Sequence, residues 1–197
     1  MTPPVLEKPT TSETTYVVLY NVSWEQMEQL DINLAGTSAR LTYLDGILEI
    51  MSPISDDHEE AKSTVSRLVE VYMRKKDIRF YIRGSATIGK KEDKTRREPD
   101  ESYNLETKKP IPDLIVEITV TSGGINKLEI YKRLGVPEVW FWEDGVLSVY
   151  SLQENGYIKV SKSILLPDLD LELLAQYSRM ADQYDAVKEY SQVISQS

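Results

Sequence analysis

The sequence predicts an α/β domain in which a mixed β-sheet is flanked by helices and extended by β-hairpins. Segments with helical periodicity both precede and interrupt segments with strand periodicity. Two Asp-Gly pairs, at 45–46 and 144–145, each separate two strand-like runs, which is a strong hairpin signal. The continuous apolar run at 112–120 is typical of a strand that is buried on both faces of a sheet.

Each expected element in the first half of the chain has its own signal. Ser23 opens a capping box, and Asp56-Asp57 can cap a long helix whose apolar residues follow one face. β-branched and aromatic residues favour strands after that helix, and the charged stretch behind them is expected to be a loop. The expected elements are a helix from Ser23, strands at 40–44 and 47–51, a helix at about 57–76, strands at 78–82 and 86–88, and a loop at 90–97.

The second half of the chain alternates strands with one short helix and then becomes helical. Ser-Gly-Gly at 122–124 breaks the buried run, and Gly135 followed by Pro137 is a usual helix stop signal. The expected elements are a strand led by 99–103, the buried strand at 112–120, a helix at 125–134, strands at 138–142, 146–152 and 157–160, and a helical, acidic segment at about 168–195.

Length and composition predict a soluble, cytoplasmic protein. The chain has 197 residues, 41% of them hydrophobic, which fits one well-cored domain over 16–197 behind a disordered or arm-like stretch at 1–15. Cysteine is absent, which excludes disulfides and thiolate metal sites and is compatible with a reducing compartment. No apolar run reaches the roughly 18 residues of a membrane helix, and the polar N-terminus has no signal-peptide pattern, so we expect no membrane partner.

Charge gives two opposing indications about nucleic acid. The net charge of −9 argues against such a partner. Residues 74–97, however, contain ten Lys or Arg and only three acidic residues. A basic segment beside a functional site suits phosphate recognition; the alternative is a solvated helix end followed by a mobile loop.

Glu117 is the most informative residue, because it places a carboxylate inside the apolar run at 112–120. A buried carboxylate costs several kcal/mol unless it is paired or bound to a metal. Glu117 is therefore expected to be functional, and the alternative is a core residue paired with an Arg or Lys.

Asp100 is the acidic residue best placed to share an ion with Glu117. Asp113 lies four residues before Glu117 on the same strand, so their Cα atoms are about 13 Å apart, too far for one ion. Asp100 belongs to a separate strand and can lie beside Glu117 if the two strands are neighbours; otherwise it is a turn residue after Pro99. Two carboxylates with carbonyls and waters suit Mg²⁺ or Mn²⁺. Such an ion lowers the pKa of a bound water and stabilises charge on a scissile phosphate.

Six stretches carry a resemblance to a known family. They are 46–53, His58 at the start of the long helix, 98–100, 113–117, 127–131 and 135–140. In this order they resemble the PD-(D/E)XK nuclease superfamily and, more narrowly, its Uma-type putative restriction endonuclease family, over about residues 20–175. The resemblance implies a restriction-endonuclease-like fold and metal-dependent hydrolysis of phosphodiester bonds in nucleic acid, with duplex DNA as the expected substrate. We also expect a homodimer.

The same resemblance implies roles for three further residues. The superfamily places a lysine two residues after the glutamate, where this chain has Thr119, so Lys127 becomes the substitute that orients water or neutralises developing charge; the alternative is an exposed helical lysine. Glu49 matches an acidic family position and could ligate metal directly, through water, or face solvent. His58 could cap the helix, support a ligand or act in catalysis. The expected catalytic residues are Asp100, Glu117, Lys127, Glu49 and His58, with Asp100 and Glu117 as metal ligands.

Two other functions stay open at this stage. The chain could be a catalytically inactive interaction module that keeps the nuclease fold and binds a protein partner, as Thr119 and the charge of −9 suggest. It could also hydrolyse a smaller phosphate ester, such as a nucleotide.

Overall fold

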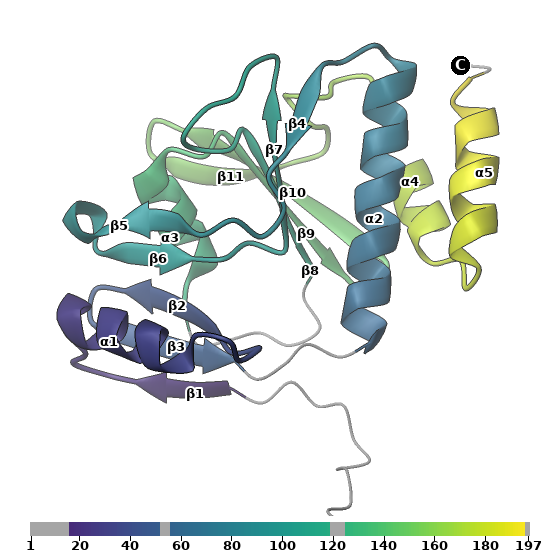
Figure 1. The fold of residues 1–197 in the computed structure, drawn as a ribbon. Coiled ribbons are helices and arrows are strands. Elements are labelled where there is room, and N and C mark those ends of the chain that lie inside the picture. Colours follow the sequence, from purple (N-terminus) through teal and green to yellow (C-terminus); the bar gives the residue numbers. More distant parts are fainter. Residues whose placement is uncertain (1–15, 52–55, 119–124, 196–197) are drawn as a thin grey trace, which may run out of the picture.

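Two β-sheets organise the computed structural model, which describes residues 16–51, 56–118 and 125–195 (Figure 1). The strands are β1 (Tyr16–Leu19), β2 (Arg40–Leu44), β3 (Ile47–Met51), β4 (Phe80–Ile82), β5 (Ile88–Lys90), β6 (Thr95–Arg97), β7 (Glu101–Leu105), β8 (Leu114–Ile118), β9 (Glu138–Glu143), β10 (Val146–Gln153) and β11 (Gly156–Val160). The helices are α1 (Trp24–Leu34), α2 (Asp56–Lys75), α3 (Lys127–Leu134), α4 (Leu171–Ser178) and α5 (Gln183–Val193). The stretch at 1–15, expected to be disordered or arm-like, and the Ser-Gly-Gly break at 122–124 lie outside the described residues.

The mixed sheet expected from the sequence is confirmed. Its six strands follow the order β11-β10-β9-β8-β7-β4, and β8 pairs in parallel with β9 while its other neighbour, β7, is antiparallel. A second, antiparallel sheet has the order β1-β3-β2-β6-β5. Helices and β-hairpins accompany these sheets, so the α/β class with hairpin additions is also confirmed.

Both Asp-Gly pairs form the hairpin turns that the sequence predicts. Asp45 and Gly46 have φ values of 48° and 85°, and Asp144 and Gly145 have values of 47° and 80°. Positive φ at both central residues is the turn whose twist matches that of the flanking strands. These turns fix the β2–β3 and β9–β10 registers.

The prediction of a loop at 90–97 is wrong. A 3-10 turn (Lys91–Asp93) joins β5 to β6 there, and β6 pairs with β2. The charged sequence of 90–97 suggested a solvated segment. However, Thr95 and Arg97 are buried, and Arg96 pairs with Asp31 on α1. Local pattern did not reveal these partners because they come from distant parts of the chain. Edge strand β1 was not expected either.

The two faces of β8 pack against different layers. Leu114, Val116 and Ile118 belong to the core formed with α2, α4 and α5. Ile115 points the other way, into a second core that contains residues of α3, β2 and β5. Side chains alternate along a strand, so Glu117 shares the Ile115 face and points toward α3 and the five-stranded sheet. The C-terminal helices expected at 168–195 are confirmed and cover α2 (Figure 1).

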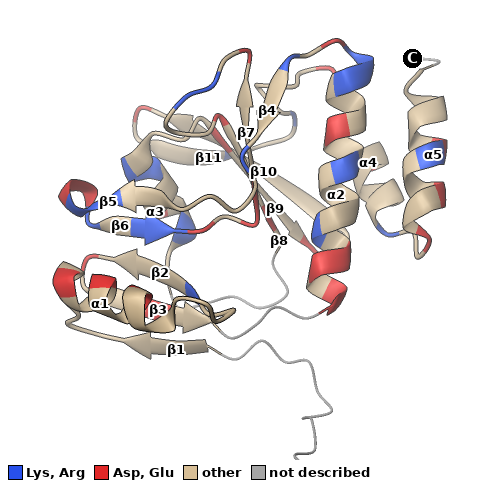
Figure 2. Cartoon of the chain, viewed as in Figure 1, with Lys and Arg blue, Asp and Glu red and all other residues tan. Residues whose placement is uncertain are grey.

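Charge is distributed unevenly along α2. Its first turn contains Asp56, Asp57 and Glu59, whereas Arg74 and Lys75 lie in its last turn (Figure 2). This arrangement complements the helix dipole. The basic segment 74–97 therefore begins at the end of α2 that is remote from His58.

Candidate active site

Glu117 lies in the second-to-last position of β8 and has no exposed surface. Arg97 donates from Nε to Glu117 Oε1 at 2.8 Å and from Nη2 to Oε2 at 2.5 Å. Lys127 Nζ lies 3.1 Å from Oε2, and the Tyr131 hydroxyl donates to Oε1. The sequence left open a Glu117 neutralised by an Arg or Lys, and the structure shows this pairing. Glu117 is therefore not the unpaired carboxylate of a preformed metal site.

Arg97 reaches Glu117 from the five-stranded sheet. It is the last residue of β6, it is 4% exposed, and its Nη1 also donates to Thr42 Oγ1 at 2.8 Å. Thr42 on β2 lies directly opposite Glu49 on β3, and cross-strand partners share one face of a sheet. Glu49 is buried, which excludes the alternative that it faces solvent, and it lies on the face from which Arg97 crosses to Glu117.

Asp100 lies beside the end of β8, as the sequence predicts for neighbouring strands. It directly precedes β7, where Glu101 is paired with Val116 in antiparallel register. Asp100 is 4% exposed, and its Oδ1 accepts from Arg40 Nη1 at 2.7 Å. Its Oδ2 accepts the Ile118 backbone N–H at 2.9 Å. The carboxylate is thus part of the site and not only a turn residue.

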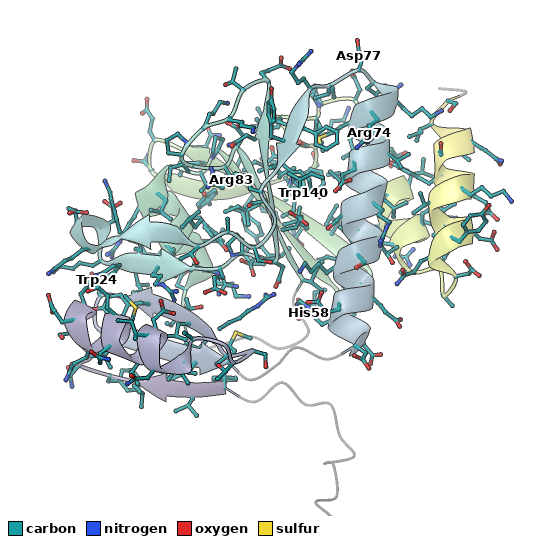
Figure 3. The ribbon with its side chains drawn as sticks, viewed as in Figure 1. Trp24, His58, Arg74, Asp77, Arg83 and Trp140 are labelled. Atoms are coloured by element: carbon teal, nitrogen blue, oxygen red, sulfur yellow. The ribbon has the colours of Figure 1, made fainter. Side chains whose placement is uncertain are left out.

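His58 connects α2 to the end of β8. Its Nε2 lies 3.0 Å from the Ile118 carbonyl oxygen and 3.4 Å from Asp100 Oδ2, and Figure 3 shows the side chain beside this strand end. A carbonyl oxygen can only accept a hydrogen bond, so Nε2 carries the hydrogen. This contact supports a positioning role for His58.

The neighbouring cations keep both acids ionised. Burial acts to raise the pKa of Asp100, but the hydrogen bond and charge of His58, together with Lys127 and Arg97, hold that pKa well below its usual range. Burial likewise opposes ionisation of Glu117, and the charges of Arg97 and Lys127 outweigh it, so the pKa of Glu117 is lowered. Burial also raises the pKa of Tyr131, which therefore remains a protonated donor.

Lys127 is the first residue of α3, where Asn126 caps the helix by accepting the Glu129 N–H. This start places Lys127 over the Glu117 carboxylate, and only 14% of its side chain is exposed. The alternative of an exposed helical lysine is therefore wrong. Thr119, the position where the superfamily has its lysine, lies outside the described residues.

Sequence reasoning brought Asp100, Glu117, Lys127 and His58 together and missed Arg97, Tyr131 and Arg40. Tyr131 is buried on α3, and its hydroxyl contacts Glu117. Arg97 was counted only among the charges of the expected loop. The available signal was the buried carboxylate itself, which requires a cation from elsewhere in the chain.

Three oxygen-bearing groups at the end of β8 are of the kind that binds a divalent cation. They are the Asp100 and Glu117 carboxylates and the Ile118 carbonyl, which His58 links to Asp100. Mg²⁺ commonly binds one or two carboxylates and completes its shell with waters and substrate phosphate. The described residues contain no group of three or more His, Asp or Glu side chains arranged to hold an ion.

The comparison with family models identifies the family of this chain. The model called Uma2, described as putative restriction endonuclease, matches residues 24–191 and so includes every residue of the site. The chain belongs to the Uma2 family. This membership agrees with the α/β fold and confirms the family resemblance of the sequence. A comparison with curated proteins finds no match for this Uma2 protein. Its described helices include none that is long and apolar enough to cross a membrane.

Proposed function

We propose that this Uma2 protein hydrolyses phosphodiester bonds in nucleic acid with Mg²⁺ or Mn²⁺. The proposal is supported by the position of Asp100, Glu117 and the Ile118 carbonyl at one end of β8. Lys127 contacts the Glu117 carboxylate there. These three oxygen donors would hold the ion. When bound, a divalent cation supplies an activated water and stabilises charge on the scissile phosphate.

The cations of the site are suited to an anionic substrate. Arg40, Arg97 and Lys127 pair with the two carboxylates, and Arg40 also lies 4.0 Å from Glu59. The Arg40 and Lys127 side chains are 20% and 14% exposed, so a phosphate group that approaches from solvent can contact them. Such contacts orient the phosphate and stabilise the charge that develops on it.

Arg97 and Tyr131 act as positioning residues. Both are buried and hold the Glu117 carboxylate from the protein interior. His58 performs the corresponding task for Asp100 and Ile118. A carboxylate held by buried partners loses little rotamer freedom when a ligand binds, and such supporting contacts preorganise a site.

Family membership supports duplex DNA as the substrate, and the absence of cysteine is compatible with the cytoplasm. We also propose a homodimer, because a twofold-symmetric dimer, the commonest symmetric assembly, would present one copy of the site to each strand of a duplex.

A second candidate is a catalytically inactive module that binds a protein partner. The extensive pairing of Glu117 favours it, because a carboxylate with Arg97, Lys127 and Tyr131 as partners is already neutralised without an ion. In this case the buried ion pair would only join the two sheets.

Cleavage of supercoiled plasmid DNA with Mg²⁺ or Mn²⁺ tests the proposal. We expect the wild type to nick or linearise the plasmid and Asp100→Asn to lower the rate by about a hundredfold or more. Lys132→Met is a matched control, because Lys132 is an exposed residue of the same helix as Lys127. Undiminished cleavage by Asp100→Asn would contradict the proposed site. Cleavage of nucleotide esters alone would reassign the substrate class, and a protein that neither cleaves DNA nor binds Mn²⁺ would favour the module.

A further inference from the structure

The acceptor capacity of Glu117 is fully used. An ionised carboxylate has about four lone-pair positions. Arg97 occupies one on each oxygen, the Tyr131 hydroxyl takes a second on Oε1, and Lys127 takes a second on Oε2. A cation that binds Glu117 must therefore replace one of these donors.

Arg97 and Tyr131 are poorly suited to leave. The Arg97 side chain is 5% exposed and also donates to Thr42 and Tyr131. Tyr131 is fully buried on the inner face of α3. If either moved away, other buried polar groups would lose their hydrogen bonds, which costs more than the loss of a solvated contact.

Lys127 is the donor that can leave at low cost. Its 3.1 Å contact with Oε2 is longer than the 2.8 and 2.5 Å contacts of Arg97. Within the described residues, Glu117 is the one ion-pair partner of Lys127. The lysine side chain is partly exposed and ends in a rotatable, strongly hydrated ammonium.

We propose that Lys127 occupies the cation position on Glu117 Oε2 and that Mn²⁺ or Mg²⁺ displaces it into the substrate-facing side of the site. This inference rests on the proposed function, because it requires that the site binds the ion. It assigns two alternating partners to the Lys127 ammonium: Glu117 in the free protein, and a substrate phosphate when the cation is present. Arg97 stays on Glu117 in both states.

Mn²⁺ affinity tests the displacement without relying on activity. Calorimetric titration with Mn²⁺ alone should show tighter binding to Lys127→Met than to wild type, by about tenfold, because the substitution removes both a competitor and a nearby positive charge. Lys132→Met removes the same charge from an exposed position of α3 and should leave the affinity unchanged. Asp100→Asn should lose binding.

The chemical reactivity of the ammonium supplies a second readout on the unaltered protein. Acetylation by an amine-reactive ester, followed by mass spectrometry, should label Lys127 several-fold faster when Mn²⁺ is added, whereas Lys132 should be labelled at a constant rate. Equal or weaker Mn²⁺ binding by Lys127→Met, or a constant labelling rate at Lys127, would overturn the inference while wild-type binding upheld the proposed function. Tighter binding by Arg97→Met alone would show that Arg97 is the displaced donor. Absence of Mn²⁺ binding by the wild type would overturn both proposals.

Discussion

The contact between Arg97 and Glu117 joins the two sheets through a pair of buried charges. Both side chains lose their hydration, which costs free energy. This cost is offset by a two-point contact between them and by further hydrogen bonds with Thr42, Tyr131 and Lys127. Such a pair contributes little net stability as a whole. Removing one member is costly, because the other charge then stays buried without its partner.

Single and double substitutions of this pair should therefore differ in a characteristic way. We expect Arg97→Met and Glu117→Leu each to lower the free energy of unfolding by about 3–5 kcal/mol. The double variant should lose less than the sum of the two, by about 1–3 kcal/mol. Urea unfolding of the four proteins measures this coupling.

Lys91→Met is the control for the loss of a surface ion pair, because Lys91 and Glu25 are both exposed. It should leave stability unchanged within error. If the Arg97 and Glu117 substitutions were equally neutral, the pair would not have the structural role described here.

Among the residues of the site, the sequence predicted the acidic side chains better than their cationic partners. Glu117 was identifiable because a carboxylate contradicts its apolar surroundings. Arg97 was not, since a basic residue in a charged stretch matches its local pattern. Only the pairing of β6 with β2 brings it to Glu117, and that pairing depends on residues about 50 positions away.

The β5–β6 hairpin is the element that positions Arg97, and Gly89 permits its close approach. Gly89 has a φ of 112° and lies against the backbone of β6. A Cβ there would overlap the Thr95 carbonyl oxygen and lie 2.7 Å from the Thr95 carbonyl carbon. Gly36 also has a positive φ, of 85°, but a Cβ there would meet no atom within 4 Å.

This difference makes the two glycines a matched pair for mutagenesis. Gly36→Ala should cost about 1 kcal/mol of stability from backbone strain alone. Gly89→Ala should cost about 3 kcal/mol or more, because the added methyl group also forces the two strands apart. Thermal or urea unfolding distinguishes the two, and equal costs would show that the hairpin tolerates separation.

Elements with strong local signals were predicted well. The capping box at Ser23, both Asp-Gly hairpins, the long helix α2 and the stop at Gly135 all appear where expected. The errors lie at β1 and β6, short strands whose formation depends on partners in the sheet rather than on their own sequence. The division into two sheets could not be derived for the same reason.

Over the whole molecule, two groups of acids respond to pH in opposite directions. Asp100 and Glu117 have lowered pKa values, so they add stability above the unfolded-state values of about 3.9 and 4.3, and this contribution is lost as pH falls further. Burial raises the pKa values of Glu70 and Glu101. Their contribution is therefore greatest at low pH and is lost as pH rises through the folded-state values.

Substitution of Glu101 should isolate the second effect. Glu101→Gln removes a buried group whose ionisation is opposed by burial, so its effect on stability should be more favourable at pH 7.5 than at pH 5. Urea unfolding of the variant and the wild type at both values measures this difference. An effect of the same size at both pH values would contradict the assignment.

Anomalous diffraction from crystals soaked in Mn²⁺ locates the proposed ion without any assay of activity. We expect a peak at the end of β8, in contact with Asp100, Glu117 and the Ile118 carbonyl, with Lys127 moved away from Glu117 and Arg97 still paired with it. A peak elsewhere, with Lys127 and Arg97 both still bound to Glu117, would contradict this expectation.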